Sequence, residues 1–188
     1  RKDYVLDRWV IISEKRGSRP KQFTSTHDAD DTFPCFFCAG EEYQTPEEIG
    51  RIPHPHDDSK WTIRWFRNKF PVVDNDSSPN MDYSSLLFVK GGAFGHHEVV
   101  VETEDHMKQL WDLNEIQIKE LFAVYRQRIK EIEKDDCINY VQVFKNHGPK
   151  AGTSIVHSHT QIVGLAKVPP AVMEESEKSF NDDKCLFC

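Results

Sequence analysis

The chain has 188 residues, of which 38% are hydrophobic and 29% charged, and its formal net charge is −7. That is enough apolar material for one globular domain or for part of a larger protein. The negative charge argues against nucleic acid as a partner. No apolar run approaches the ~20 residues that cross a bilayer, and no secretion signal opens the chain. We therefore expect a cytoplasmic protein without a membrane partner.

The first predicted element is a strand over residues 4–13, which carries a buried apolar run at residues 9–12. A basic loop follows and contains Arg16 and Arg19. Taken alone, a loop of this composition is typical of a solvated surface.

Two cysteine pairs have the spacing C-x-x-C, Cys35 with Cys38 and Cys185 with Cys188. Without a secretion signal, this spacing indicates metal or redox chemistry rather than a structural disulfide. No βαβ pattern of the thioredoxin kind flanks the first pair, so zinc is favoured. Zinc needs two further ligands, which we expect to be histidines, and the residues alone do not choose among the nine histidines of the chain.

The segment after the first cysteine pair is predicted to consist of short strands and loops. A proline-rich stretch at residues 51–58 is expected to be a surface loop with solvated histidines at positions 54 and 56. Strands are predicted at residues 61–66, 86–90 and 97–103. A glycine-rich segment joins the last two of these strands, which are therefore expected to pair as a hairpin.

The clearest helix covers residues 115–133, where apolar residues recur at three- and four-residue spacing. Asn114 is a suitable N-cap, and Gln117 stands where a capping box requires it. A shorter helix is predicted over residues 104–111. The apolar stripe of the long helix comprises Ile118, Leu121, Phe122, Tyr125, Ile129 and Ile132.

Two further strands, residues 138–144 and 153–165, lie on either side of a loop rich in hydrogen-bond donors. The loop contains Asn146, Gly152 and Ser154, and residues of these types allow close approach of an anionic oxygen and donate to it. The predicted elements together give an α+β fold with a mostly antiparallel sheet and flanking helices.

The last predicted strand carries the strongest functional signal of the chain. Side chains alternate along a strand, so His157, His159 and Gln161 share one face. Three polar side chains in an apolar, β-branched strand are hard to explain as core packing, although a solvated face is the simpler alternative. The donor loop directly before them favours a phosphate site beside a nucleophile or base.

In this order, the motifs resemble the galactose-1-phosphate uridylyltransferase family of the HIT-like superfamily, to which ADP-glucose phosphorylase is also close. The resemblance extends over nearly the whole chain. The segments that carry it are Arg8-Trp9-Val10-Ile11, Arg16 with Arg19-Pro20, Cys35 with Cys38, Asn68 with Phe70-Pro71, the strand from His97 to Thr103, Asn146 with Gly148, Gly152 with Ser154, and the row His157, His159 and Gln161.

The resemblance implies a metal site and a nucleophile. The zinc ligands would be Cys35, Cys38, His106 and His157, which leaves His96 and His97 without a role. His159 would attack the α-phosphorus of a nucleoside diphosphate sugar and form a covalent nucleotidyl-imidazole, which a hexose 1-phosphate or phosphate then resolves.

The same resemblance assigns the groups around the nucleophile. The catalytic residues would be His159, Gln161 and Ser154. Gln161 would donate an amide N–H to a nonbridging phosphate oxygen, and because an amide is neither acid nor base, transfer would be favoured over hydrolysis. Arg16 and Arg19 would bind a sugar phosphate across a homodimer interface. The expected substrate-binding residues are Arg16, Arg19, Asn68, Asn146, Gly152, Ser154 and Gln161.

Two departures from the uridylyltransferase pattern leave the nucleobase open. Ser158 stands where those enzymes usually have proline, and Thr160 where they have glycine or serine; a serine between the histidines resembles the ADP-glucose phosphorylase branch. We expect transfer of UMP from a UDP-hexose to a hexose 1-phosphate. The alternatives are adenylyl transfer from ADP-glucose to phosphate and, from another class, a non-catalytic zinc-containing nucleotide-binding module.

The resemblance also predicts the domain organisation. Residues 1–165 are expected to form the N-terminal HIT-like nucleotidyltransferase domain. Residues 166–188 are expected to be a linker and the start of a second, mostly absent HIT-like half. In that reading Cys185 and Cys188 begin a possible second metal site, and the chain is a fragment of a two-lobed protein.

Overall fold

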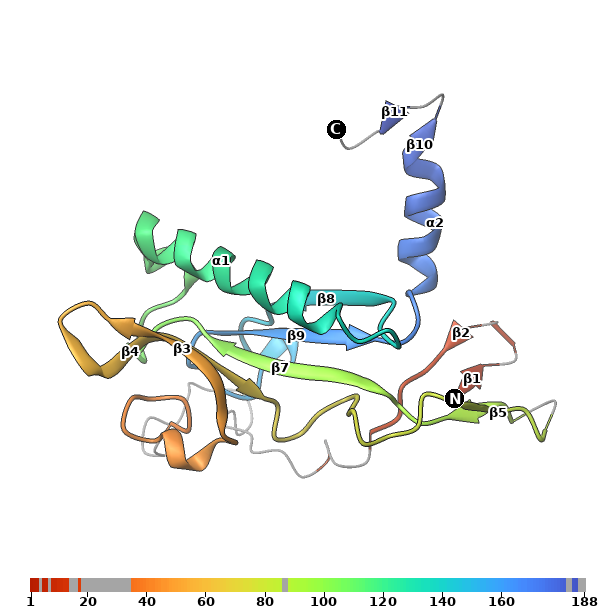
Figure 1. The fold of residues 1–188 in the computed structure, drawn as a ribbon, viewed down its shortest axis with the longest axis horizontal. Helices are drawn as coiled ribbons and strands as arrows, with labels where there is room; N and C mark the ends of the chain where they lie inside the picture. Colours follow the sequence, from red (N-terminus) through yellow and green to blue (C-terminus); the bar gives the residue numbers. More distant parts are fainter. Residues whose placement is uncertain are drawn as a thin grey trace.

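The computed structural model describes residues 1–3, 5–6, 8–13, 17, 35–85, 88–181 and 184–185. Its centre is a five-stranded sheet with the strand order β3-β4-β7-β9-β8 (Figure 1). Every pairing in this sheet is antiparallel, which confirms the predicted α+β class. The strands are β3 (Glu48–His54), β4 (Asp57–Arg67), β7 (Gly95–Val101), β8 (Tyr140–Phe144) and β9 (His159–Leu165).

The two faces of the sheet carry different layers. Helix α1 (Glu115–Ile132) covers one face, and the segment that starts at Cys35 and includes the short 3-10 helix η2 (Glu42–Gln44) crosses the other (Figure 1). Because neighbouring strand residues point to opposite faces, Trp65 packs in the α1 layer and Phe66 in the cysteine layer. The cysteine layer contains the buried residues Cys35, Phe37, Trp61, Phe66, Val99 and Val101.

Helix α1 begins as predicted. The Gln117 N–H donates to Asn114 Oδ1 over 2.9 Å, and the Asn114 N–H donates to Gln117 Oε1 over 3.1 Å, which confirms the capping box. The predicted apolar stripe is partly wrong, because Phe122 is 61% exposed. The buried positions are Leu121, Val124 and Ile132.

The proline-rich stretch at residues 51–58 is not a loop, as the sequence suggested, but most of a β-hairpin. Strand β3 runs to His54 and β4 starts at Asp57, so only Pro55 and His56 form the turn. Pro53 lies at irregularities of the β3–β4 register. A proline is tolerated there because β3 is an edge strand of the five-stranded sheet.

The hairpin predicted between residues 86–90 and 97–103 is wrong. Strand β6 (Lys90–Gly91) pairs with β5 (Met81–Asp82), whereas β7 pairs with β4 and β9. The glycine-rich segment does not turn a hairpin but packs closely against the chain before it, since a Cβ on Gly92 would lie 2.4 Å from the Ser78 carbonyl oxygen. Residues 86 and 87 lie outside the described residues.

The short helix predicted over residues 104–111 is also wrong. The Thr103 hydroxyl accepts from the Asp105 N–H over 3.2 Å, and the Asp105 carboxylate accepts from the Met107 N–H over 3.0 Å. Such local side-chain hydrogen bonds compete with the helical pattern. The segment is therefore a series of turns that ends in the 3-10 helix η3 (Leu110–Asp112), and these turns present His106.

The two ends of the chain differ most from the predictions. The strand predicted over residues 4–13 is reduced to a small hairpin of β1 (Lys2–Asp3) and β2 (Arg8–Trp9), and Ile12 is 64% exposed rather than buried. This hairpin lies outside the main sheet, so the apolar run has no sheet face to cover (Figure 1).

The carboxyl end contains a helix that the sequence analysis missed, α2 (Pro170–Ser179). It is rich in glutamate, and it leaves the sheet and stands apart from it (Figure 1). It leads to the short strands β10 (Phe180–Asn181) and β11 (Lys184–Cys185). Among the described residues, no helix combines the length and the hydrophobicity that crossing a bilayer requires.

Candidate active site and metal centre

The predicted reactive row lies at the start of β9, on the face of the sheet that carries the cysteine layer. The strand begins at His159 rather than at residue 153, so His157 belongs to the approaching loop. Both imidazoles nevertheless face the ring of Phe37, with centroid separations of 6.4 Å for His157 and 5.2 Å for His159. Both histidines are buried, which excludes the solvated-face alternative.

The four predicted metal ligands converge on one point, with all ligand atoms within 4.8 Å of one another. His157 Nδ1 lies 3.6 Å from the sulfurs of both Cys35 and Cys38, and His106 Nδ1 lies 3.4 Å from Cys38 Sγ. In a tetrahedral zinc site, bonds of ~2.3 Å to sulfur and ~2.0–2.1 Å to nitrogen separate S and N ligands by roughly 3.6 Å. The donor set therefore fits a zinc-sized cation.

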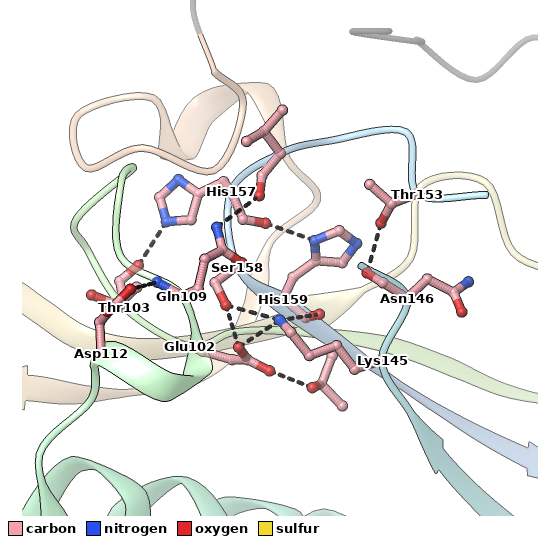
Figure 2. Close-up of polar contacts among 12 residues, drawn as sticks. Glu102, Thr103, Gln109, Asp112, Lys145, Asn146, Thr153, His157, Ser158 and His159 are labelled. Carbon is pink, nitrogen blue, oxygen red and sulfur yellow. Dashed lines mark hydrogen bonds and ion pairs between the residues drawn. The ribbon is translucent and has the colours of Figure 1, made fainter. Parts of the chain in front are cut away.

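The protonation chemistry of the cluster agrees with this fit. His157 Nε2 lies 2.7 Å from the Thr103 carbonyl oxygen and donates its proton there, so the Nδ1 lone pair points into the cluster (Figure 2). Burial lowers the pKa of His157 to about 4, which keeps this imidazole neutral. Burial and the neighbouring Cys35 raise the pKa of the Cys38 thiol to about 12. Thiolates at this position therefore need a cation beside them.

His159 has the orientation and charge state of a nucleophile. Its Nδ1–H donates to the His157 carbonyl oxygen over 2.8 Å, which leaves the lone pair on Nε2 (Figure 2). Burial lowers the pKa of His159, so the ring is neutral near pH 7. The side chain borders two cavities.

The first cavity has a volume of about 120 Å³ and lies between the cysteine layer and the donor loop. Its walls combine the aromatic rings of Phe36, Phe37, Phe66 and Phe70 with polar groups. A cavity lined mainly by apolar and aromatic side chains with a few polar groups suits a nucleotide. The predicted site residues on this cavity are Asn68, Gly152, Ser154, His159 and Gln161.

The other predicted site residues lie elsewhere. Asn146 borders the second cavity, of about 220 Å³, on which His159 also lies. The Asn146 carbonyl oxygen accepts from the Thr153 hydroxyl over 2.8 Å, which ties the two ends of the donor loop (Figure 2). Arg16, Arg19 and Cys188 lie outside the described residues, and of Cys185 only the backbone in β11 is described.

A buried carboxylate that the sequence analysis missed lies on the face of β9 opposite to the candidate site and accepts hydrogen bonds there (Figure 2). Glu102 is fully buried and accepts from Lys145 Nζ over 2.8 Å, from Ser158 Oγ over 2.5 Å and from the Thr160 hydroxyl. Lys145 Nζ also donates to the His159 carbonyl oxygen over 3.2 Å. The Glu102–Lys145 ion pair thus fixes the backbone of His159, the candidate nucleophile, from the opposite face of the strand.

The charge state of Glu102 follows from these contacts. Burial alone would raise its pKa, but the charge and hydrogen bonds of Lys145 together with the hydroxyl donors outweigh burial and hold the pKa below its ordinary value. Ser158 and Thr160, the two departures from the uridylyltransferase pattern, both donate to this carboxylate. A glutamate after a run of valines was the signal in the sequence that could have revealed it.

Comparison with known proteins gives consistent matches along the whole chain. Residues 1–169 match the family described as galactose-1-phosphate uridyl transferase, N-terminal domain. An ADP-glucose phosphorylase of Arabidopsis thaliana is 36% identical in an alignment 200 residues long, which covers 100% of this chain and 55% of that protein. A galactose-1-phosphate uridylyltransferase of Thermotoga maritima is 28% identical over 168 residues, covering 89% of this chain and 46% of that protein.

Solved structures give the same result. The crystal structure of an Arabidopsis thaliana ADP-glucose phosphorylase with bound ADP-glucose aligns with a TM-score of 0.66 at 35% identity, covering 95% of this chain and 53% of that one. A uridylyltransferase structure aligns with a TM-score of 0.67 at 27% identity, covering 95% and 49%. The chain thus spans about half the length of the curated relatives it matches.

Proposed function

This chain belongs to the galactose-1-phosphate uridylyltransferase family, and on that premise we propose that it carries the nucleophile of a nucleotidyltransferase acting on nucleoside diphosphate sugars. One observation supports the proposal above all others. His159 is buried, borders an apolar cavity and gives its Nδ1–H to the His157 carbonyl oxygen over 2.8 Å. This leaves a neutral imidazole whose Nε2 lone pair can attack phosphorus.

The proposed reaction balances without an external acid or base. His159 Nε2 bonds to the α-phosphorus, the bond from that phosphorus to the bridging oxygen breaks, and the sugar 1-phosphate leaves with the electron pair. The ring keeps its Nδ1 proton, which remains hydrogen-bonded to the His157 carbonyl. A phosphate oxygen of the acceptor then attacks the same phosphorus, the bond from that phosphorus to Nε2 breaks, and its electron pair returns to Nε2, which restores the neutral ring. Gln161, whose amide is neither an acid nor a base near pH 7, suits this sequence because it stabilises charge by N–H donation without activating water.

The family relation favours UMP transfer from a UDP-hexose to a hexose 1-phosphate. A second candidate is adenylyl transfer from ADP-glucose to phosphate, and it is favoured by the 36% identity with a relative named ADP-glucose phosphorylase. Ser158 also favours the second candidate, because a serine between the two histidines resembles the ADP-glucose phosphorylase branch, whereas the uridylyltransferases usually have proline there.

Covalent labelling tests the proposal. The full-length protein is expected to acquire an acid-labile label within one turnover when incubated with a sugar nucleotide that carries ³²P in its α-phosphate, tested separately as UDP-glucose and ADP-glucose. The labelled protein is then offered galactose 1-phosphate or inorganic phosphate, and the acceptor that removes the label identifies the transferase or the phosphorylase. Absence of label with both donors would overturn the proposal in favour of a nucleotide-binding module.

We also propose that Cys35, Cys38, His106 and His157 hold one zinc ion, on the strength of their spacing and of the Thr103 contact. A bound zinc ion would compensate the thiolates and act as a structural tie. His157 would then be fixed on both ring nitrogens, and His159, which donates to its carbonyl, would be aimed by it.

Substitution of His157 tests the metal site. His157→Asn is expected to lower the zinc content by one equivalent per chain, measured by inductively coupled plasma mass spectrometry, because one of the four donors is lost. His56→Asn, in the turn between β3 and β4, is the matched control and should keep its zinc. Full zinc content in the His157 variant would show that the ligand set is wrong.

The remaining predictions complete the proposal. We propose a cytoplasmic homodimer in which Arg16 and Arg19 bind the sugar phosphate across the interface. The division at residue 165 and a second metal site at Cys185 and Cys188 belong to the same proposal, as does a second half of the protein that carries further sugar contacts.

A further inference from the structure

His97 is a buried histidine to which neither the sequence motifs nor the proposed metal site gives a role. It lies on β7 next to β9 and is only 5% exposed. In the β7–β9 register Val99 pairs with Gln161 and His97 with Val163, so His97 and Gln161 are diagonal neighbours on the same face. The His97 ring therefore lies next to the Gln161 amide of the candidate active site.

The hydrogen bonds of His97 define its tautomer. The Val72 backbone N–H lies 3.0 Å from His97 Nδ1, and because a backbone N–H can only donate, Nδ1 carries the lone pair. The ring proton is therefore on Nε2, which lies 3.0 Å from Gln161 Oε1. His97 donates, and the Gln161 carbonyl oxygen accepts.

This donation decides which way the Gln161 amide faces. The oxygen and nitrogen of an amide exchange places by a half turn, so nothing in Gln161 itself selects one orientation. With its oxygen held by His97, the amide presents its NH₂ group on the other side, and Gln161 borders the same cavity as His159. The reversed amide would present a carbonyl oxygen to the phosphate and repel it.

We propose that His97 is a positioning residue that fixes the Gln161 amide with its N–H groups toward the phosphate of the bound nucleotide. The inference rests on the proposed function, in which that phosphate lies beside His159. Asn68 is tied to the same strand residue through its backbone, since the Asn68 N–H donates to the His97 carbonyl oxygen over 2.7 Å. The Asn68 Nδ2 lies 3.1 Å from His97 Nε2, but both atoms carry protons, so the Nε2 proton is left for the Gln161 oxygen. His97 thus lies beside two amide side chains of the cavity wall, Asn68 and Gln161.

A double-mutant cycle in the full-length protein tests whether His97 acts through Gln161. His97→Leu is expected to lower the rate of covalent labelling about 10–100-fold, mainly in kcat, as is usual when a residue that orients an active-site group is lost. His97→Gln keeps a donor near the position of Nε2 and should recover part of the rate. When Gln161 is already alanine, His97→Leu should cost less than about threefold, because the orientation it controls no longer matters. Fully additive losses would overturn the proposal in favour of a packing role.

The adjacent histidine offers a matched control. His96 lies on the opposite face of β7, where its Nε2 contacts the Asp135 carboxylate over 2.9 Å. His96→Leu should change the labelling rate less than about twofold, and a loss equal to that of His97→Leu would count against a specific role.

A spectroscopic measurement separates this inference from the proposed function. Long-range ¹H–¹⁵N correlation spectra of histidine-labelled protein should show His97 as the Nε2–H tautomer, with or without substrate. The Nδ1–H tautomer would overturn the inference whatever the protein catalyses. Failure of the wild-type protein to label with either nucleotide sugar, with the Nε2–H tautomer in place, would overturn the proposed function while the hydrogen bond from His97 to Gln161 stood.

Discussion

His159→Asn is expected to abolish nucleotide transfer, with a fall in rate of about 10⁴-fold or more, because no other group can take the place of a covalent nucleophile. Asparagine is the informative replacement. Its amide nitrogen can occupy the place of Nδ1 and keep the hydrogen bond to the His157 carbonyl, which spans 2.8 Å in the structure. It has nothing at the position of Nε2, so only the attacking atom is removed.

Covalent labelling with the preferred nucleotide sugar measures this loss, and zinc analysis of the same samples tests the division of roles. His159→Asn should retain its zinc and acquire no label, whereas His157→Asn should lose its zinc. The two residues are adjacent in the row and both are buried, so a general disturbance would affect them alike. Equal loss of metal in both variants would show that the two histidines have been assigned wrongly.

The parts of the fold that depend on local sequence were predictable. Helix α1 follows from its apolar spacing, and its start follows from Asn114 and Gln117, which bond to each other within one turn. The hairpin expected around the glycine-rich segment failed because pairing is decided at long range. Strand β7 is buried between β4 and β9, and these two strands satisfy its backbone better than a neighbour in sequence could.

The site was predictable to the extent that its residues lie in short motifs. The cysteine pair, the row of histidines and the donor loop each occupy one short stretch of sequence. The resemblance supplied His106 as the remaining metal ligand. Glu102 and His97 were missed because their roles depend on partners on β9, about 60 residues away: Thr160 for Glu102 and Gln161 for His97. The register between β7 and β9 brings His97 to Gln161, and Glu102 directly follows the last paired residue of β7, Val101.

The Glu102–Lys145 pair gives the largest predicted effect on stability. Lys145→Met removes the counter-charge of a fully buried carboxylate and is expected to lower the free energy of unfolding at pH 7 by about 3–5 kcal/mol. In the double variant with Glu102→Gln no charge remains unpaired, so it should be more stable than Lys145→Met alone by about 1–3 kcal/mol. Urea-induced unfolding of the full-length protein, followed by circular dichroism, measures both differences.

The pH dependence of this loss identifies its cause. In the wild-type protein the pKa of Glu102 lies below its ordinary value of 4.5, so the stability it contributes is complete above pH 4.5 and is lost as the pH falls further. In Lys145→Met burial is no longer outweighed and raises the pKa of Glu102, so this variant regains stability on acidification. The difference between the two proteins should therefore be largest near pH 7 and shrink toward pH 4.5.

A matched control separates burial from the mere loss of a lysine. Lys119 forms an ion pair with Glu115 over 2.7 Å on the exposed side of α1, where water screens the charges. Lys119→Met should leave the free energy of unfolding nearly unchanged at every pH, because neither charge is buried when its partner is removed. If Lys145→Met unfolded no more readily than Lys119→Met, the buried Glu102 carboxylate would not stabilise β9. The position of His159 would then depend only on the opposite face of the sheet, where the proposed metal ligands lie.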